Sequence, residues 1–214
     1  MRKILGLSIL WVIFASNNII ADEQVRFQNQ FNNCVVSKKA INDYEPKQFN
    51  NTNNALRAVG KVPHFDGEPI IIKGVIRGKD CKPLANVKIQ LWQANSRGKY
   101  PYQPLKSAVN KGLIEISDND SFTGSAEAYS NNFGEFTLLS VYPDVTDNEY
   151  PFIMLRAGGS YLNGFQTKFY LEQPDDMNAY FSMKYDEDKL KMDKDIPVIT
   201  PNSAQEYYIN IIAG

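Results

Sequence analysis

The chain has 214 residues, of which 43% are hydrophobic and 22% are charged, and this composition is ordinary for a globular protein of about one domain. Its formal net charge is −1, with 23 Lys and Arg residues against 24 Asp and Glu residues. This balance gives no electrostatic reason to expect nucleic acid or an anionic membrane as a partner. Histidine occurs once, at His64, and this scarcity restricts the metal chemistry that the chain can support.

The N-terminus has the pattern of a secretory signal peptide. Arg2 and Lys3 precede an apolar run over residues 4–15, which suits a signal core and is shorter than the roughly 20 residues of a membrane span. We expect cleavage after Ala21 and export to the periplasm or outside the cell, and an uncleaved anchor is the alternative. Because no other segment is long and apolar enough, we expect no membrane span in the mature chain.

The chain has two cysteines, Cys34 and Cys81. In an oxidising compartment this even pair predicts one disulfide, which would tie the N-terminal segment to the body of the domain. A loop of this length contributes on the order of 4 kcal/mol of stability in the chain-entropy model. Two unrelated thiols are the alternative, since the bridge depends on export.

The rest of the chain divides into two parts. Residues 22–65 are rich in Asn and Gln with weak periodicity, which indicates an irregular N-terminal arm with at most a short helical piece. From residue 66 to residue 214, short β-branched or alternating segments are separated by Gly, Pro and Asn. The predicted strands are 69–76, 87–92, 134–138, 151–157, 165–171 and 207–212. This pattern predicts an all-β fold with an antiparallel β-sandwich core. The mixed-charge stretch 184–195 predicts a solvated helix or loop.

One segment, residues 74–100, carries most of the information. It contains a strand, a tight turn with Pro83, a second strand that ends in Trp-Gln-Ala-Asn at 92–95, and a polar loop that turns at Gly98 and presents Tyr100. This order resembles the intradiol ring-cleavage dioxygenases, the family of catechol, hydroxyquinol and protocatechuate dioxygenases.

Segments 121–124, 132–137, 141–143 and 165–171 also follow the order that this family shows further downstream. The resemblance covers about residues 60–185. It implies a β-sandwich and oxygenative opening of a catechol-type aromatic, which would be the small-molecule partner.

The resemblance also implies a ferric ion, Fe(III), held by two tyrosinates and two histidines. The first tyrosinate position is Tyr100, and the second is best matched by Tyr142, although Tyr150 also precedes a proline and competes for it. Hard ferric iron suits phenolate oxygens, and a tyrosinate in the family takes a proton from the substrate. Tyr100 and Tyr142 are therefore the candidate catalytic and metal-binding residues. Buried structural tyrosines are the alternative.

In the family, the two histidines come from a His-x-His on one strand, where residues i and i+2 share a face. The matching positions here are Ile153 and Leu155, whose side chains offer no lone pair. The family's arginine also lacks a counterpart, because Glu149 or Tyr150 occupies its neighbourhood. With one histidine in the chain, no His-x-His exists anywhere.

Carboxylates are also hard ligands, so Asp144, Asp147 and Glu149 offer an altered ferric site with the two tyrosines, and His64 offers one nitrogen. Three interpretations stay open. The chain is a dioxygenase with an altered site, a metal-free protein whose cleft binds a small aromatic, or an exported non-catalytic interaction module. A shared fold does not choose among them, because function belongs to the site.

Overall fold

The computed structural model describes residues 34–144, 150–159, 162–171, 180–183 and 204–214. The predicted signal peptide, residues 1–21, and the mixed-charge stretch 184–195 lie outside these residues. The fold described below is that of the unit Val36–Gly214. In the part of the chain that the structure describes, no helix is long and apolar enough to cross a membrane.

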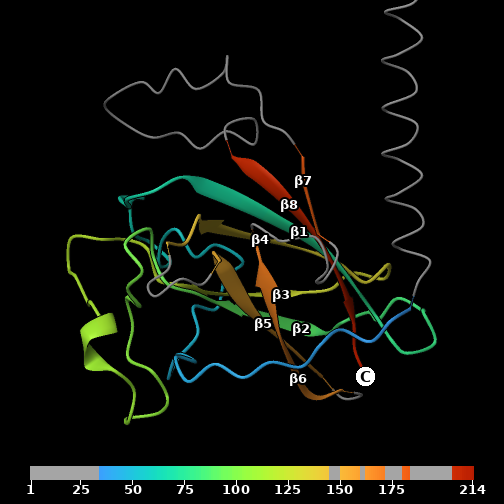
Figure 1. Cartoon of the computed structure of the whole chain (residues 1–214). Helices are drawn as coiled ribbons and strands as arrows, with labels where there is room; N and C mark the ends of the chain where they lie inside the picture. Colours follow the sequence, from blue (N-terminus) through green and yellow to red (C-terminus); the bar gives the residue numbers. More distant parts are fainter. Residues whose placement is uncertain (1–33, 145–149, 160–161, 172–179, 184–203) are drawn as a thin grey trace, which may run out of the picture. The chain divides into compact units, whose positions relative to one another are not determined.

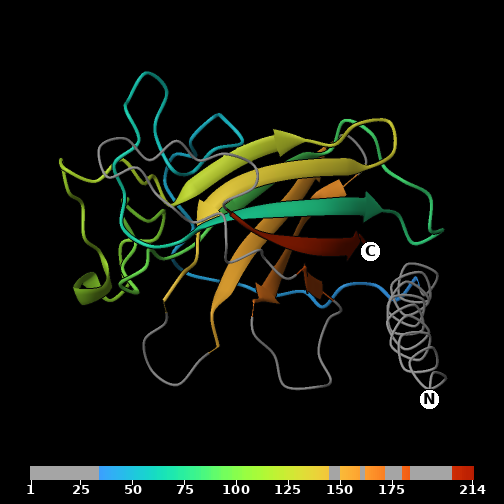
Figure 2. The same cartoon turned by 90° about the horizontal axis from the view of Figure 1, so that it is seen from above.

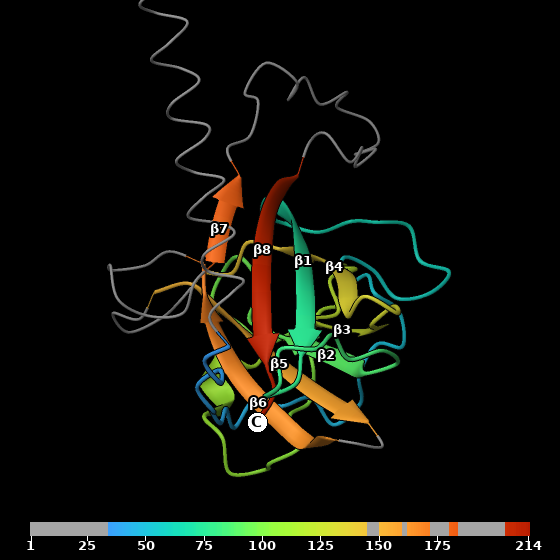
Figure 3. The same ribbon diagram turned by 90° about the vertical axis from the view of Figure 1, so that its right-hand side faces the viewer.

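Two four-stranded sheets stack as a β-sandwich (Figure 1). The first sheet has the order β4 (Glu135–Val141), β1 (Pro69–Arg77), β8 (Gln205–Ile212) and β7 (Tyr180–Met183). The second has the order β3 (Ser125–Tyr129), β2 (Lys88–Trp92), β5 (Phe152–Gly159) and β6 (Leu162–Tyr170). A single-turn 3₁₀ helix, η1 (Lys111–Leu113), lies between β2 and β3. Figure 3 shows the first sheet with its strands side by side, and the all-β prediction is confirmed.

All six predicted strands are present, and β3 and β7 are additional. The strand β8 lies inside its sheet, where it runs parallel to β1 with Ile72 opposite Tyr207. The sandwich is therefore antiparallel except for this one pair. The β1 run of consecutive isoleucines fits a parallel pair, because such strands read as continuous apolar segments.

The core lies between the two sheets, which Figure 2 shows as layers. Alternation turns every second residue of each strand inward, so the aliphatic side chains of β1, β2, β5 and β8 meet in one cluster. Each such side chain contributes about 1.5–3 kcal/mol when it is fully buried. Gly74 of β1 makes room for the ring of Phe136, because a Cβ there would lie 2.2 Å from Phe136 Cζ.

The N-terminal arm crosses the outer face of the β3-β2-β5-β6 sheet, one strand after another. In chain order, Lys39 pairs with Thr167 of β6, Glu45 binds Arg156 of β5, Phe49 packs edge-on against Trp92 of β2, and the Asn50 N–H donates to Ser125 Oγ of β3. Trp92 and Met154 are completely buried on this face. The arm is thus an integral layer of the domain, and its described residues, 34–65, contain no helix.

Candidate functional site

The loop after β2 is built to present Tyr100. The buried Asn95 accepts hydrogen bonds at Oδ1 from the N–H groups of Arg97 (3.0 Å) and Lys99 (2.9 Å), and its own N–H donates to the Lys99 carbonyl at 2.7 Å. Gly98 has a φ of +69°, a conformation that glycine adopts without steric cost. The chain therefore turns tightly and returns at Tyr100.

The side chain of Tyr100 lies in an aromatic cluster and is 5% exposed. Its backbone is fixed on both sides, since its N–H donates to the Leu113 carbonyl at 2.7 Å and its carbonyl accepts from the Glu115 N–H at 3.1 Å. The ring stacks on that of Tyr44, with centroids 4.2 Å apart and planes inclined by 3°. Tyr102 approaches edge-on at 5.8 Å. The arm, through Tyr44, therefore covers the first candidate residue.

The surroundings of Tyr102 displace the pKa of its phenol. Burial, with smaller contributions from Tyr100 and Glu45, raises the pKa of its phenol well above the ordinary value. Its buried hydroxyl has no hydrogen-bond partner among the described residues. Sequence reasoning identified neither Tyr102 nor Tyr44. Tyr102 carries a weak signal, because it follows Tyr100 by two residues, whereas nothing local marks Tyr44.

The second candidate, Tyr142, follows β4 and is half-buried against the core. Its N–H donates to the Glu68 carbonyl at 2.7 Å, and its ring lies 6.5 Å from that of Tyr207. The two motif segments do meet, because Gln93 Nε2 donates to the Val141 carbonyl at 2.7 Å and the Asp144 N–H donates to the Asn95 carbonyl at 3.1 Å. The two candidate rings nevertheless pack against different aromatic partners.

The two positions that the sequence matches to the family's histidines lie in the hydrophobic core. Ile153 and Leu155 of β5 are both 0% exposed and belong to the cluster between the sheets. Leu155 lies opposite Leu91 of β2, and Ile153 lies opposite Phe169 of β6. On its other side Leu155 lies opposite the buried Thr167 of β6, and the aliphatic side chains of both positions carry packing and offer no donor atom to a metal.

The arginine of β5 has a different role from the family's arginine. Arg156 is on the outer face of its strand, where it forms an ion pair with Glu45 and donates from Nε (2.8 Å) and Nη2 (2.6 Å) to Gln90 Oε1. Tyr150, near the family's arginine position, is exposed, and Glu149 lies outside the described residues. Arg156 therefore fastens the arm to the sheet.

The described residues do not fit a ferric ion with two tyrosinates and two histidines. His64 is exposed, and its N–H donates to Ser121 Oγ at 2.8 Å. Asp144 is exposed too, and Asp147 and Glu149 lie outside the described residues. Within the described ranges, no group of three or more His, Cys, Asp or Glu side chains is arranged to hold a metal ion. With His64 as the one histidine of the sequence, the chain cannot supply the two imidazoles of such a site.

The two cysteines, Cys34 and Cys81, are both disulfide-bonded, and the described residues contain no free cysteine. Cys81 has a φ of +65°, in the left-handed region that is uncommon for residues other than glycine.

Comparisons with known proteins agree with this fold. Residues 43–123 match a family model described as dioxygenase. A Rickettsia bellii protein that bears a provisional dioxygenase name is 44% identical over 133 residues, which is 62% of this chain and 64% of that protein. A Rickettsia conorii relative with a similar name is 44% identical over 134 residues, 63% of this chain and 62% of its own. The chain thus spans less than two thirds of the length of these relatives.

Solved structures give the same fold at low identity. An intradiol ring-cleavage dioxygenase from Tetranychus urticae superposes with a TM-score of 0.58 at 13% identity, over 84% of this chain and 95% of its own. Catechol 1,2-dioxygenase from Acinetobacter sp. ADP1 gives a TM-score of 0.56 at 12% identity, over 98% of this chain and 79% of its own. The family-model match and the Rickettsia relatives, together with the motif order from residue 74 to residue 171 and the shared sandwich fold, support the resemblance of this chain to the intradiol ring-cleavage dioxygenase family.

Proposed function

We propose that this chain is an exported member of the family that does not open aromatic rings, and that its β-sandwich serves as a binding or interaction module. The observation that carries the proposal is the filling of both histidine positions by Ile153 and Leu155, which are completely buried. Aliphatic side chains have no lone pair for iron. The replacement of the histidines therefore removes the ability to bind the metal, and it is not a change in affinity for a particular substrate.

The packing around these residues supports the same conclusion. A ferric ion beside Leu155 would lie among Leu91 and the other aliphatic side chains of the core. An ion in such surroundings loses its hydration without gaining hydrogen bonds or charged ligands, which costs far more than the whole stability of a domain. A site at this position would therefore require the core to be rebuilt.

A dioxygenase with an altered site is the second candidate. It is favoured by the retention of Tyr100 and Tyr142 and by the two hydrogen bonds that join their segments. Phenolates and carboxylates are hard ligands, and Asp144 directly follows this junction. In this alternative, iron binds without histidine, and the protein still opens the rings of catechol-type aromatics.

Iron loading separates the two candidates. The mature chain from Asp22 is purified, ferric iron is added anaerobically, and the visible tyrosinate-to-iron absorption is recorded, followed by catechol consumption in air. We expect a colourless and inactive protein, with a catechol 1,2-dioxygenase as the positive control. Stoichiometric colour that disappears in Tyr100→Phe, together with ring opening, would establish the altered enzyme.

Two further measurements address binding and export. Thermal unfolding with catechol in the absence of iron tests whether the old cleft still takes a small aromatic, which would raise the melting temperature by mass action. N-terminal sequencing of the exported chain tests the leader. We expect the mature chain to begin at Asp22, and a chain that retains Met1 after export would contradict cleavage.

A further inference from the structure

The two sheets are joined at one edge by the arm. The Glu127 N–H of β3 donates to the Thr52 carbonyl at 2.8 Å, while in β4 the Leu139 N–H donates to the Asn53 carbonyl at 2.8 Å and the Leu139 carbonyl accepts from the Ala55 N–H at 2.8 Å. Both strands are the outermost of their sheets. A short extended piece of chain therefore occupies the slot between two strand edges through main-chain hydrogen bonds.

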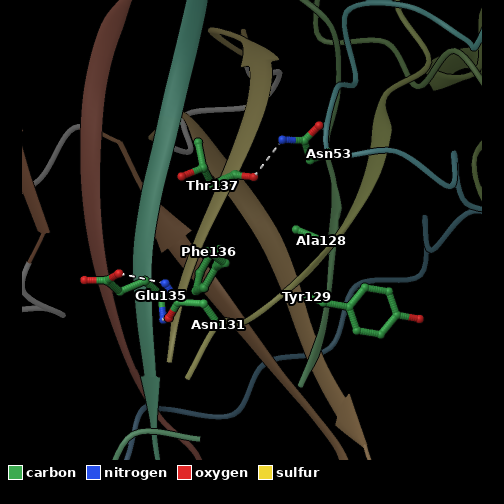
Figure 4. A pocket seen from close by; sticks show the side chains of 7 residues that line it. All are labelled: Asn53, Ala128, Tyr129, Asn131, Glu135, Phe136 and Thr137. Carbon is green, nitrogen blue, oxygen red and sulfur yellow. Dashed lines mark hydrogen bonds between the residues drawn. The ribbon is translucent and has the colours of Figure 1, made fainter. Parts of the chain in front are cut away.

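The slot continues beyond this piece as a hollow. It has a volume of about 360 Å³ and lies between the arm and the turn that joins β3 to β4, as Figure 4 shows. Its lining residues are Asn53, Ala128, Tyr129, Asn131, Glu135, Phe136 and Thr137. Ala128 and Phe136 belong to the core-facing rows of their strands and form an apolar floor.

Strand geometry directs backbone groups into this hollow. Leu139 turns its N–H and carbonyl away from β1 and toward the arm, so Thr137, two residues earlier, turns its own groups to the same side. In β3, Glu127 turns its N–H away from β2 and toward the arm, so Tyr129, two residues later, turns its backbone groups to the same side. The Thr137 carbonyl accepts a hydrogen bond of 3.3 Å from Asn53 Nδ2, while the Thr137 N–H faces the hollow.

One exposed aromatic residue lines the hollow, and a second belongs to the turn between the lining residues Asn131 and Glu135. Tyr129 at the end of β3 is 62% exposed, and Phe133 in the following turn is 71% exposed. Aromatic side chains are enriched at protein interfaces, where they supply large contact areas. A chain that leaves the hollow on the side of the turn therefore meets apolar surface that is ready to be covered.

We propose that this hollow binds an extended segment of a partner polypeptide, which adds to β3 and β4 as the arm does in the first part of the slot. The inference rests on the proposed function as an interaction module and names its partner class. The arm shows that the slot accepts extended backbone, and strand addition is a general mode of peptide recognition. The bound segment has a small apolar side chain over Ala128 and Phe136 and no proline at the bonded positions.

The length of the hollow limits the affinity. From Glu135 to Thr137, β4 advances by two steps of about 3.4 Å, so two or three residues of the partner are held by main-chain bonds. Few bonds of this kind give modest affinity, and contacts with Tyr129 and Phe133 add to it. The module is thus suited to reversible capture of flexible chain segments.

A displayed library of linear peptides of about seven residues is the probe. Peptides are selected on the full mature chain and measured by fluorescence anisotropy against three proteins: wild type, Thr137→Pro and Thr137→Ser. Proline removes the N–H that faces the hollow and is tolerated on edge strands, whereas serine keeps it. We expect the selected peptides to bind wild type and Thr137→Ser alike and to bind Thr137→Pro about tenfold more weakly.

Two further readouts keep the test decisive if Thr137→Pro fails to fold. Ala128→Leu fills the floor of the hollow and should also weaken binding, and hydrogen exchange of the Tyr129 and Thr137 amides in wild type should slow when peptide is added. The inference is overturned if no peptide is selected. It is also overturned if Thr137→Pro and Ala128→Leu both bind the selected peptides as tightly as the wild type does. A wild-type dimer, seen by light scattering, that Thr137→Pro dissociates overturns it too, because a second copy would then be the occupant.

The outcomes also separate this inference from the proposed function. Ring opening by the iron-loaded chain would refute the proposed function whatever the peptides do. A colourless, inactive chain that binds no peptide at the slot would refute the strand-addition site and leave the non-catalytic proposal intact.

Discussion

The two faces of β5 carry opposite kinds of side chain. Toward the core, Ile153 and Leu155 are aliphatic and completely buried. Toward the arm, Arg156 forms an ion pair with Glu45, hydrogen-bonds Gln90 and lies 5.2 Å over the ring of Phe49. On this strand, therefore, the core-facing positions that the sequence matches to the family's iron ligands lie in the hydrophobic core, while the charged side chain lies on the opposite face and holds the arm.

This contrast separates the requirements of the family's fold from the requirements of the family's reaction. The fold needs apolar side chains between the sheets, and Ile153 and Leu155 satisfy that need better than imidazoles would. The family's reaction needs donor atoms at the same two positions. A chain can therefore keep the scaffold and even gain core stability without the ligands, so likeness to the family indicates the fold, and the chemistry depends on the site.

Placing imidazole on the core face gives the largest expected effect. Leu155→His removes a buried aliphatic side chain and buries ring nitrogens without partners, so we expect a loss of about 3–5 kcal/mol in the free energy of unfolding. Urea denaturation measures it. Leu155→Met is the matched control and should lose less than about 1.5 kcal/mol. If Leu155→His kept wild-type stability and took up iron, the position would be a preserved site and not core.

Removing the Arg156–Glu45 ion pair on the outer face should lower the free energy of unfolding by less than Leu155→His does. The side chains of Arg156 and Glu45 are 25% and 17% exposed, so Arg156→Met leaves a largely covered carboxylate unpaired, and we expect a loss of about 2 kcal/mol. A double-mutant cycle with Glu45→Gln isolates the pair. Limited proteolysis should also cut the arm faster in Arg156→Met.

Arg97 is the internal control for this prediction. It pairs on the surface with Asp66 and, at 3.4 Å, with Glu115, where the three side chains are 41%, 70% and 45% exposed. The more covered Asp120 lies farther away, at 3.8 Å. Exposed pairs of this kind contribute less than about 1 kcal/mol because water screens them, so Arg97→Met should leave both stability and the arm almost unchanged. Equal losses in the two variants would mean that the arm is not held by the Arg156 pair.

The strands could be predicted from the sequence because alternation is local. The run from Val87 to Trp92 shows its inward and outward residues directly, and the structure confirms them. The strand β3 was missed because its Ser-Ala-Glu-Ala-Tyr sequence has little of the β-branched character that marks strands. The parallel pairing of β1 with β8 was missed as well, since it joins segments more than a hundred residues apart and no local pattern encodes it.

The candidate site also divides into features with a local sequence pattern and contacts between distant segments. Tyr100, Ile153 and Leu155 could be singled out from the sequence because each is matched to a short motif of fixed order, and their roles stay predictions. The cover over Tyr100 was not found, since the stacking partner Tyr44 lies in an irregular segment without periodicity. The Glu45–Arg156 pair joins residues 111 positions apart. Contacts of this range arise from the path of the arm, which only the folded chain reveals.

The smallest expected effect concerns Tyr102, which lies beside the arm and feels the charge of Glu45. Its buried hydroxyl has no partner among the described residues, so Tyr102→Phe removes a polar group that gains nothing from burial. We expect the free energy of unfolding at pH 7 to stay the same or to rise by up to about 1 kcal/mol. Chemical denaturation of the two proteins in parallel measures the difference.

The pH dependence of this variant gives a second, independent readout. The pKa of Tyr102 is raised in the folded protein, so above the unfolded value of about 10 the unfolded chain has lost this proton while the folded chain still holds it. The unfolded state then binds fewer protons, and stability falls as pH rises through that region. Tyr102→Phe should show a shallower fall between about pH 9 and pH 11 than the wild type. An identical fall in both proteins would mean that the Tyr102 hydroxyl reaches water, and that the arm does not seal the aromatic cluster around Tyr100.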